Sequence, residues 1–343
     1  MASLHETYKY IADIISFKSD LAQLQDNITS KRIDWSDIVK VASDHLVLTT
    51  VYCRLKDKSL LQYLPEDLKD YLTELTAINR NRNDVLVEDI TEISKLFSTN
   101  HINHVFLKGA AIIISGYYED SGERMIGDID ILVERSQVNL AKKLLITMDY
   151  LPGDILLSEK YQDKRHIPRL VNETKLAPIE IHTELLMKKH LNKLSSKDVL
   201  IKKQYVNGVF VPHASHLLNH CILSFQINDN GNYFNSIHLK NIYDSLVITK
   251  KHQSLAIQLH DNAYQKFFLF SSIYFQDIQK PNQTLKNKIL SRCFVLNTKN
   301  NTIGLLKTQF LKNILNMKVL INRFLLFLKN KNYRADLIQS LKQ

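Results

Sequence analysis

The chain has 343 residues, 45% of them hydrophobic and 23% charged, with a formal net charge of +10. This composition is ample for a buried core, and the length is consistent with one to three globular domains. No apolar run approaches the roughly 18 residues of a membrane span, and the N-terminus lacks the basic-then-apolar pattern of a secretory signal. The three cysteines, Cys53, Cys221 and Cys293, are isolated and odd in number, which favours reduced thiols over a disulfide framework or a zinc site. We therefore expect a cytoplasmic protein with no membrane partner.

The N-terminal part, residues 1–98, is predicted to form a helical region. Apolar residues recur there at three- and four-residue spacing, as within residues 11–15. Trp35, which directly follows an aspartate, indicates one helix start, and the Leu-Pro-Glu-Asp at 64–67 indicates another. The Asn-Arg-Asn-Arg-Asn at 79–83 offers two arginines to nucleic acid, but a solvated helix face is the simpler interpretation.

The stretch from residue 105 to residue 133 contains two apolar runs that each meet polar residues. The first run predicts a buried strand that leads into Lys108 and Gly109. Gly109 permits a tight turn into a helix predicted over residues 110–118. The N-terminus of such a helix presents bare backbone N–H groups, which suit a phosphate.

The second run carries Asp128 and Asp130. Alternate residues of a strand share a face, so these carboxylates are expected on one open face with Cα atoms roughly 6.6 Å apart. That spacing suits a pair of metal ions about 3.5–4 Å apart, as in two-metal phosphoryl chemistry. Oxygen ligands favour Mg²⁺ or Mn²⁺. A lone Asp-x-Asp is a weak signal, and a solvated strand face is its ordinary explanation.

Between residues 99 and 212 strand and helix patterns alternate, which predicts an α+β core with a mixed sheet. Ser136 is a candidate cap for a following amphipathic helix. Strand-like segments follow at residues 166–171, 176–182 and 205–211. Asn207-Gly208 indicates a hairpin turn within the last of them.

The remainder, residues 213–343, is predicted to form a C-terminal helical region. Lys240 and Asp244 lie one helical turn apart and are expected to pair, either beside a triphosphate or base or as a surface ion pair. Residues 299–343 contain nine Lys or Arg against Asp336 alone, a net charge of +8.

This basic terminal segment has two interpretations. Its apolar side carries Leu311, Leu315, Phe324 and Leu328. It either contacts nucleic acid or an acidic partner, or it is a terminal helix whose apolar stripe packs on the body while its lysines face water. The second interpretation is favoured, because the segment lacks the interleaved aromatic and basic residues of an RNA-binding module.

Together these motifs resemble the nucleotidyltransferase fold, and specifically its bacterial branch of uncharacterised nucleotidyltransferases. The resemblance rests on Leu-Lys-Gly at 107–109, on Arg124 ahead of Gly-Asp-Ile-Asp-Ile-Leu-Val, and on Ile-Glu-Ile-His at 179–182. It implies an α+β core over 99–212, flanked by the helical regions 1–98 and 213–343. It also implies that Glu180 joins Asp128 and Asp130 as the catalytic, metal-binding acids.

The resemblance further implies a set of nucleotide-binding residues. Ala110 stands where relatives often have Gly or Ser, and Lys108 and Arg124 are expected to compensate as cations for the phosphates. The full expected set is Lys108, Gly109, Ala110, Arg124, His182, Lys240 and Asp244.

The function implied is Mg²⁺- or Mn²⁺-dependent transfer of a nucleoside monophosphate from an NTP, with ATP the first choice. The acceptor is a hydroxyl of a protein, a tRNA or a small molecule, and pyrophosphate leaves. Two alternatives stay open: a non-catalytic relative that binds a nucleotide or a partner, and a metal-dependent nuclease that uses the same acids.

Overall fold

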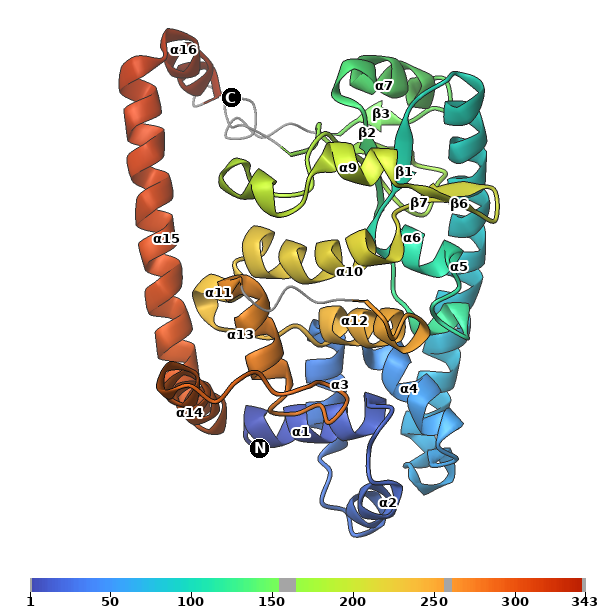
Figure 1. Ribbon diagram of the computed structural model, residues 1–343, viewed down its shortest axis with the longest axis vertical. Helices are drawn as coiled ribbons and strands as arrows, with labels where there is room; N and C mark the ends of the chain where they lie inside the picture. Colours follow the sequence, from blue (N-terminus) through green and yellow to red (C-terminus); the bar gives the residue numbers. More distant parts are fainter. Residues whose placement is uncertain (1, 154–164, 256–260, 341–343) are drawn as a thin grey trace.

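The computed structural model describes residues 2–153, 165–255 and 261–340 (Figure 1). It is an α+β protein in which a mixed five-stranded sheet is preceded and followed by helices. In Figure 1 the first helices lie at the bottom, the sheet at the upper right, and the long helix α15 along the left edge. The predicted fold class is confirmed. Among the described residues, no helix has both the length and the apolar character needed to cross a membrane.

The N-terminal region is helical, as its apolar periodicity predicts. Its elements are α1 (Leu4–Ile15), α2 (Leu21–Thr29), α3 (Trp35–Asp44), α4 (Leu48–Asp57), the 3₁₀ turn η1 (Leu61–Tyr63) and α5 (Glu66–Thr99). Asp34 caps α3, because its side chain accepts from the backbone N–H groups of Ser36 and Asp37. Pro65 directly precedes α5, where a missing N–H costs nothing. Both predicted helix starts are confirmed.

The central sheet has the strand order β1-β2-β5-β4-β3. Its strands are β1 (His104–Phe106), β2 (Ile129–Val133), β3 (Leu151–Pro152), β4 (Leu170–Val171) and β5 (Ile179–His182). Strands β2 and β5 are parallel, and the other neighbouring pairs are antiparallel. The register of the parallel pair places Asp130 beside Glu180 and Leu132 beside His182. Two motifs 50 positions apart in the chain therefore meet at the centre of the sheet.

The helix after β1 differs from the prediction. Helix α6 spans Lys108–Ile114 rather than residues 110–118. Its left-handed residue is Lys108, with φ of 47°, and not Gly109. Gly109 is needed for another reason: a Cβ there would lie 3.1 Å from Cγ1 of Ile126. The glycine thus permits the close approach of the loop that leads into β2.

Three further local predictions are corrected or refined by the structure. Ser136 caps no helix; it lies in the 3₁₀ turn η3 (Arg135–Gln137), which is followed by α7 (Val138–Ile146). The segment 166–171 forms only the short strand β4, preceded by an isolated bridge at His166. The Asn207-Gly208 turn is confirmed, with φ of 49° and 83°. Its strands β6 (Gln204–Val206) and β7 (Val209–Val211) form a sheet of their own and do not extend the mixed sheet.

The chain after the sheet is helical, as predicted. It contains the 3₁₀ turn η4 (Lys188–Lys193), α9 (Ser196–Ile201), α10 (Ala214–Leu223) continued by a π turn (Ser224–Asn228), α11 (Gly231–Phe234), α12 (Leu239–Lys251), α13 (Asn262–Ser271), α14 (Leu285–Lys299), α15 (Asn301–Lys329) and α16 (Lys331–Ser340). One apolar core joins the N-terminal helices, the sheet and the helices as far as α14. The division into three regions therefore stays a prediction.

The favoured interpretation of the basic terminal segment is wrong for the second half of α15. No residue of α15 is fully buried. Of the four apolar residues expected to pack on the body, Leu311 and Leu315 are partly buried, whereas Phe324 and Leu328 are 62% and 56% exposed.

Candidate active site

Three buried side chains form a compact acidic cluster on strands β2 and β5. Nε2 of His182 lies 2.7 Å from Oδ1 of Asp130 and 3.6 Å from Oε2 of Glu180. One donor atom from each of the three lies within 4.8 Å of the others. Because Asp130 and Glu180 are neighbours in the parallel register, the sheet itself fixes this grouping. Asp128, predicted as a ligand, lies outside the group, just before β2.

Two cations balance the acids. Nζ of Lys108 donates to Oδ1 of Asp130 at 2.6 Å. Arg169 donates from Nε to Glu180 at 2.7 Å and from Nη2 to Asp128 at 3.1 Å. Sequence reasoning missed Arg169. The antiparallel pairing of β4 with β5 aligns residue 170 with residue 179, so it brings residue 169 opposite Glu180. The sequence does show a basic residue next to the strand that precedes the Glu180 strand. Which residue of β5 it faces, however, depends on how β4 and β5 pair in the fold.

The surroundings keep the two central acids ionised. Burial alone would raise the pKa of Asp130, but the charge of Lys108 and the bond from His182 hold it below its usual range. Burial likewise opposes ionisation of Glu180, yet the neighbouring His182 and the hydrogen bond from Arg169 lower its pKa to about 2. At His182 the hydrogen bond with Asp130 and the nearby Glu180 overcome burial and raise the pKa. At neutral pH the cluster therefore presents carboxylates, the form that binds a metal ion.

A cavity of about 330 Å³ lies beside this cluster, within the size range of ligand pockets. Of the residues predicted to bind nucleotide, it is lined by Lys108, Gly109, Arg124, Lys240 and Asp244. Asp128 and Asp130 also line it, whereas Ala110 and His182 are buried away from it. His220, from α10, adds a further wall residue whose pKa burial lowers to about 3. Seven of the predicted residues thus line one cavity, whereas Ala110, His182 and Glu180 do not.

Arg124 and Asp244 form a buried pair in the wall of this cavity. The guanidinium donates to both carboxylate oxygens, at 2.8 and 2.9 Å, and the Tyr118 hydroxyl donates to Asp244 at 2.6 Å. Asp244 therefore pairs with Arg124 and not, as predicted, with Lys240. Burial lowers the pKa of Lys240, and the charge of Arg124 lowers it further. Lys240 has no carboxylate partner within the described chain.

The segment 79–83 has a role that neither interpretation of its sequence anticipated. Asn79 and Asn83 are buried on α5 and donate to the backbone carbonyl of Arg124, at 3.3 and 2.7 Å. The first arginine of the segment forms an ion pair with Asp120 at 2.7 Å. Helix α5 thus holds the loop that delivers Asp128 and Asp130 to the cavity, and the segment is neither a solvated face nor exposed for nucleic acid.

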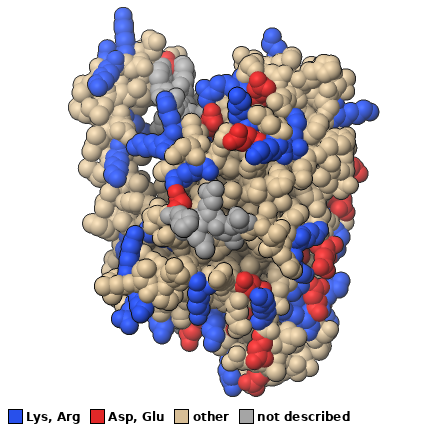
Figure 2. Space-filling view, viewed as in Figure 1, with Lys and Arg blue, Asp and Glu red and all other residues tan. Residues whose placement is uncertain are grey.

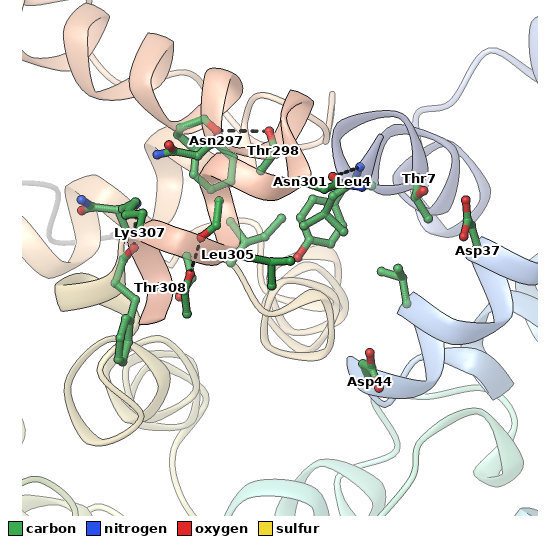
Figure 3. Close-up of a pocket in the computed structure, with 18 of the residues that line it drawn as sticks. Leu4, Thr7, Asp37, Asp44, Asn297, Thr298, Asn301, Leu305, Lys307 and Thr308 are labelled. Atoms are coloured by element: carbon green, nitrogen blue, oxygen red, sulfur yellow. Dashed lines mark hydrogen bonds between the residues drawn. The ribbon is translucent and has the colours of Figure 1, made fainter. Parts of the chain in front are cut away.

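A second and larger hollow, of about 520 Å³, lies between α1, α3, α11 and the start of α15 (Figure 3). Its rim includes Asp37 and Asp44, and its wall is joined by a 3.1 Å hydrogen bond from the backbone of Leu4 to Asn301. Among the described residues, the only group of side chains placed to share a metal ion is the acidic cluster on β2 and β5. We therefore assign the chemistry to the smaller cavity.

Comparison with known proteins agrees with the motifs. A family model described as "Uncharacterised nucleotidyltransferase" matches residues 31–258, which is more than half of the chain. A crystal structure of an antigenic nucleotidyltransferase-like protein from Paracoccidioides brasiliensis matches with 16% identity, over 66% of this chain and 93% of that chain, at a TM-score of 0.33. No curated protein matches the chain.

Proposed function

The chain belongs to the uncharacterised nucleotidyltransferase family, as its motifs predict, and from that premise we propose that it transfers a nucleoside monophosphate from an NTP to an acceptor hydroxyl. Pyrophosphate is the leaving group. ATP is the first donor to test, and the acceptor is a protein, a tRNA or a small molecule. The observation that carries the proposal is the pair of buried carboxylates on neighbouring strands, Asp130 and Glu180, of which Asp130 lines a cavity of about 330 Å³.

The donor set of the cluster fits a divalent metal ion. Asp130 and Glu180 offer hard oxygen ligands, with one atom of each and of His182 within 4.8 Å of the others. His182 would offer its imidazole nitrogen once a metal ion displaced the proton between it and Asp130. Oxygen ligands suit Mg²⁺, and Mn²⁺ also accepts nitrogen. Asp128 is retained as a further proposed ligand. A metal bound here supplies Lewis acidity toward the phosphate oxygens.

The remaining roles fall to side chains that line the cavity. Lys108 and Lys240 are placed to neutralise phosphate charge, because both line the cavity and both carry an ammonium group. Asp128 lines the cavity, and burial, followed by repulsion from Asp130, raises its pKa. A metal ion held beside it would favour its ionised form, as its proposed role of ligand requires. Arg124 serves by fixing Asp244 and the cavity wall.

The proposal is tested by transfer of radiolabel from each of four α-³²P-labelled NTPs, with Mg²⁺ or Mn²⁺. The purified protein is incubated with a cell extract that is then separated into protein, RNA and small-molecule fractions. We expect label in one fraction, lost with Asp130→Asn and kept with Asp70→Asn, an exposed aspartate of α5. Label that persists in Asp130→Asn contradicts the assignment. Degradation of RNA without added NTP favours the nuclease alternative instead.

A further inference from the structure

Helix α15 exposes apolar side chains that a helix of a monomeric protein ordinarily buries. It is 29 residues long, none of them buried, and it forms one edge of the molecule (Figure 1). In its second half six large apolar side chains are 43–62% exposed: Met317, Leu320, Ile321, Phe324, Leu325 and Leu328. An exposed apolar surface of this extent marks an interaction site.

The six exposed side chains lie on one side of the helix. Since an α-helix advances about 100° per residue, the arc from Leu320 round to Leu325 covers about 140° of the circumference and contains all six. Arg323 separates this arc from Val319, which is 41% exposed. Lys318 lies beyond the other end of the arc, so the apolar surface has cations on both flanks. This pattern is typical of a helix that lies on a lipid surface.

The charges of α15 all have one sign. Asn301–Lys329 contains five Lys or Arg and no Asp or Glu. Figure 2 shows Lys and Arg side chains along this edge of the molecule. Two copies of α15 placed side by side would repel each other. A nucleic acid would meet the lysines but would leave the apolar surface in water. An anionic lipid surface accommodates both the positive charges and the apolar side chains. The apolar side chains reach the acyl boundary, while Lys and Arg contact phosphate headgroups.

The attachment of α15 leaves its second half outside the body. Asn301 accepts from Leu4 at 3.1 Å, Lys307 donates to the carbonyl of Phe234 at 3.1 Å, and Leu311 accepts from Tyr233. These bonds all lie in the first half of the helix. The second half is followed by α16, and Arg334 of α16 donates to two backbone carbonyls near the end of α15. A flat surface can therefore approach along this second half, which is about 20 Å long.

We propose that α15 binds to the surface of a membrane that contains anionic lipid, with its axis in the plane of the surface. The helix lies on the membrane and does not cross it, in agreement with its hydropathy. The proposal is independent of the transferase assignment, because it concerns another face of the molecule.

Flotation of the full chain with lipid vesicles tests the proposal. Vesicles of phosphatidylcholine alone are compared with vesicles that contain about a fifth phosphatidylglycerol. We expect binding only to the anionic vesicles, weakened by salt. Ile321→Glu with Phe324→Glu is expected to abolish it. The matched control is Ile78→Glu on α5, where the side chain is 57% exposed, similar to 52% for Ile321.

A second variant tests the electrostatic part. Lys312→Gln with Arg323→Gln removes two positive charges from α15. It is expected to weaken binding roughly 25-fold, about fivefold per charge. Circular dichroism and melting curves confirm that each variant is folded, which is expected since all these side chains lie outside the core.

Three results would overturn the proposal. The first is absence of binding to anionic vesicles at low salt. The second is equal binding by the Ile321→Glu, Phe324→Glu variant. The third is a dimer, detected by light scattering, that forms without lipid and is lost in the same variant, since the apolar surface would then be covered by a second copy of the chain.

Discussion

Asp244→Asn is expected to destabilise the protein rather than weaken nucleotide binding directly. Asp244 is 3% exposed and Arg124 is 4% exposed, and two hydrogen bonds of 2.8 and 2.9 Å join them. The substitution leaves the guanidinium buried without a compensating charge. Breaking a buried pair from one side costs about 3–5 kcal/mol. With an unfolding entropy of about 2.1 cal/mol/K per residue, the melting temperature should fall by about 4–7 °C for a chain of 343 residues.

Thermal unfolding followed by circular dichroism measures this effect. The matched control is Asp229→Asn, because Asp229 lines the same cavity but is exposed. Adding Arg124→Gln to Asp244→Asn should cost less than the sum of the two single changes, since no unpaired charge remains. An unchanged melting temperature together with weaker NTP binding would refute this reasoning, and Asp244 would then contact the nucleotide as its sequence position suggests.

Two further predictions concern the metal site and the pH dependence of stability. Arg169→Gln removes a cation that competes with a metal ion for Asp128 and Glu180. The affinity for Mn²⁺ should therefore rise about five- to tenfold, a modest gain because the Arg169 side chain is half exposed. An unchanged Mn²⁺ affinity, measured by calorimetry, would contradict this prediction. Burial raises the pKa of Glu123 to about 7 from an unfolded value of 4.5, so the folded state holds the extra proton and stability falls as pH rises between these values. Glu123→Gln should remove that slope and, above pH 7, add up to about 3 kcal/mol in urea unfolding; parallel pH profiles of the two proteins would count against it.

The acids could be predicted from the sequence because strand alternation is a local property. Asp130 and Glu180 each stand between isoleucines, and the buried isoleucines fix which way each carboxylate points. The family resemblance implied that Glu180 joins Asp128 and Asp130. That Asp130 and Glu180 meet depends on the parallel register of β2 and β5, which only the structure shows. The hairpin at Asn207-Gly208 was predictable for a similar reason, since two adjacent residues set its turn.

The partners of these acids could not be predicted, because they depend on long-range placement. Lys240 and Asp244 have ideal spacing for a helical pair, but a surface pair of this kind contributes little, and the buried guanidinium of Arg124 captures the carboxylate. Arg169 meets Glu180 only through the pairing of β4 with β5. The left-handed backbone at Lys108 has no signal in its residue type, because lysine rarely adopts it. Tertiary contacts decided each case.

The sequence also could not predict whether the terminal helix α15 packs on the rest of the protein. The apolar spacing of α15 predicts an amphipathic helix, and the structure has that helix. Periodicity indicates that a face requires burial but not what covers it. Phe324 and Leu328 remain exposed because no other described segment lies over them.

The most direct test of the transferase assignment is the stoichiometry of a single turnover. With the acceptor fraction identified, α-³²P-labelled NTP and enzyme are mixed with Mg²⁺, and the label joined to the acceptor is measured beside the pyrophosphate released. We expect one labelled nucleotide transferred for each pyrophosphate released, and neither product with Asp130→Asn. Pyrophosphate released with free labelled monophosphate, or equal yields from Asp130→Asn, would contradict it.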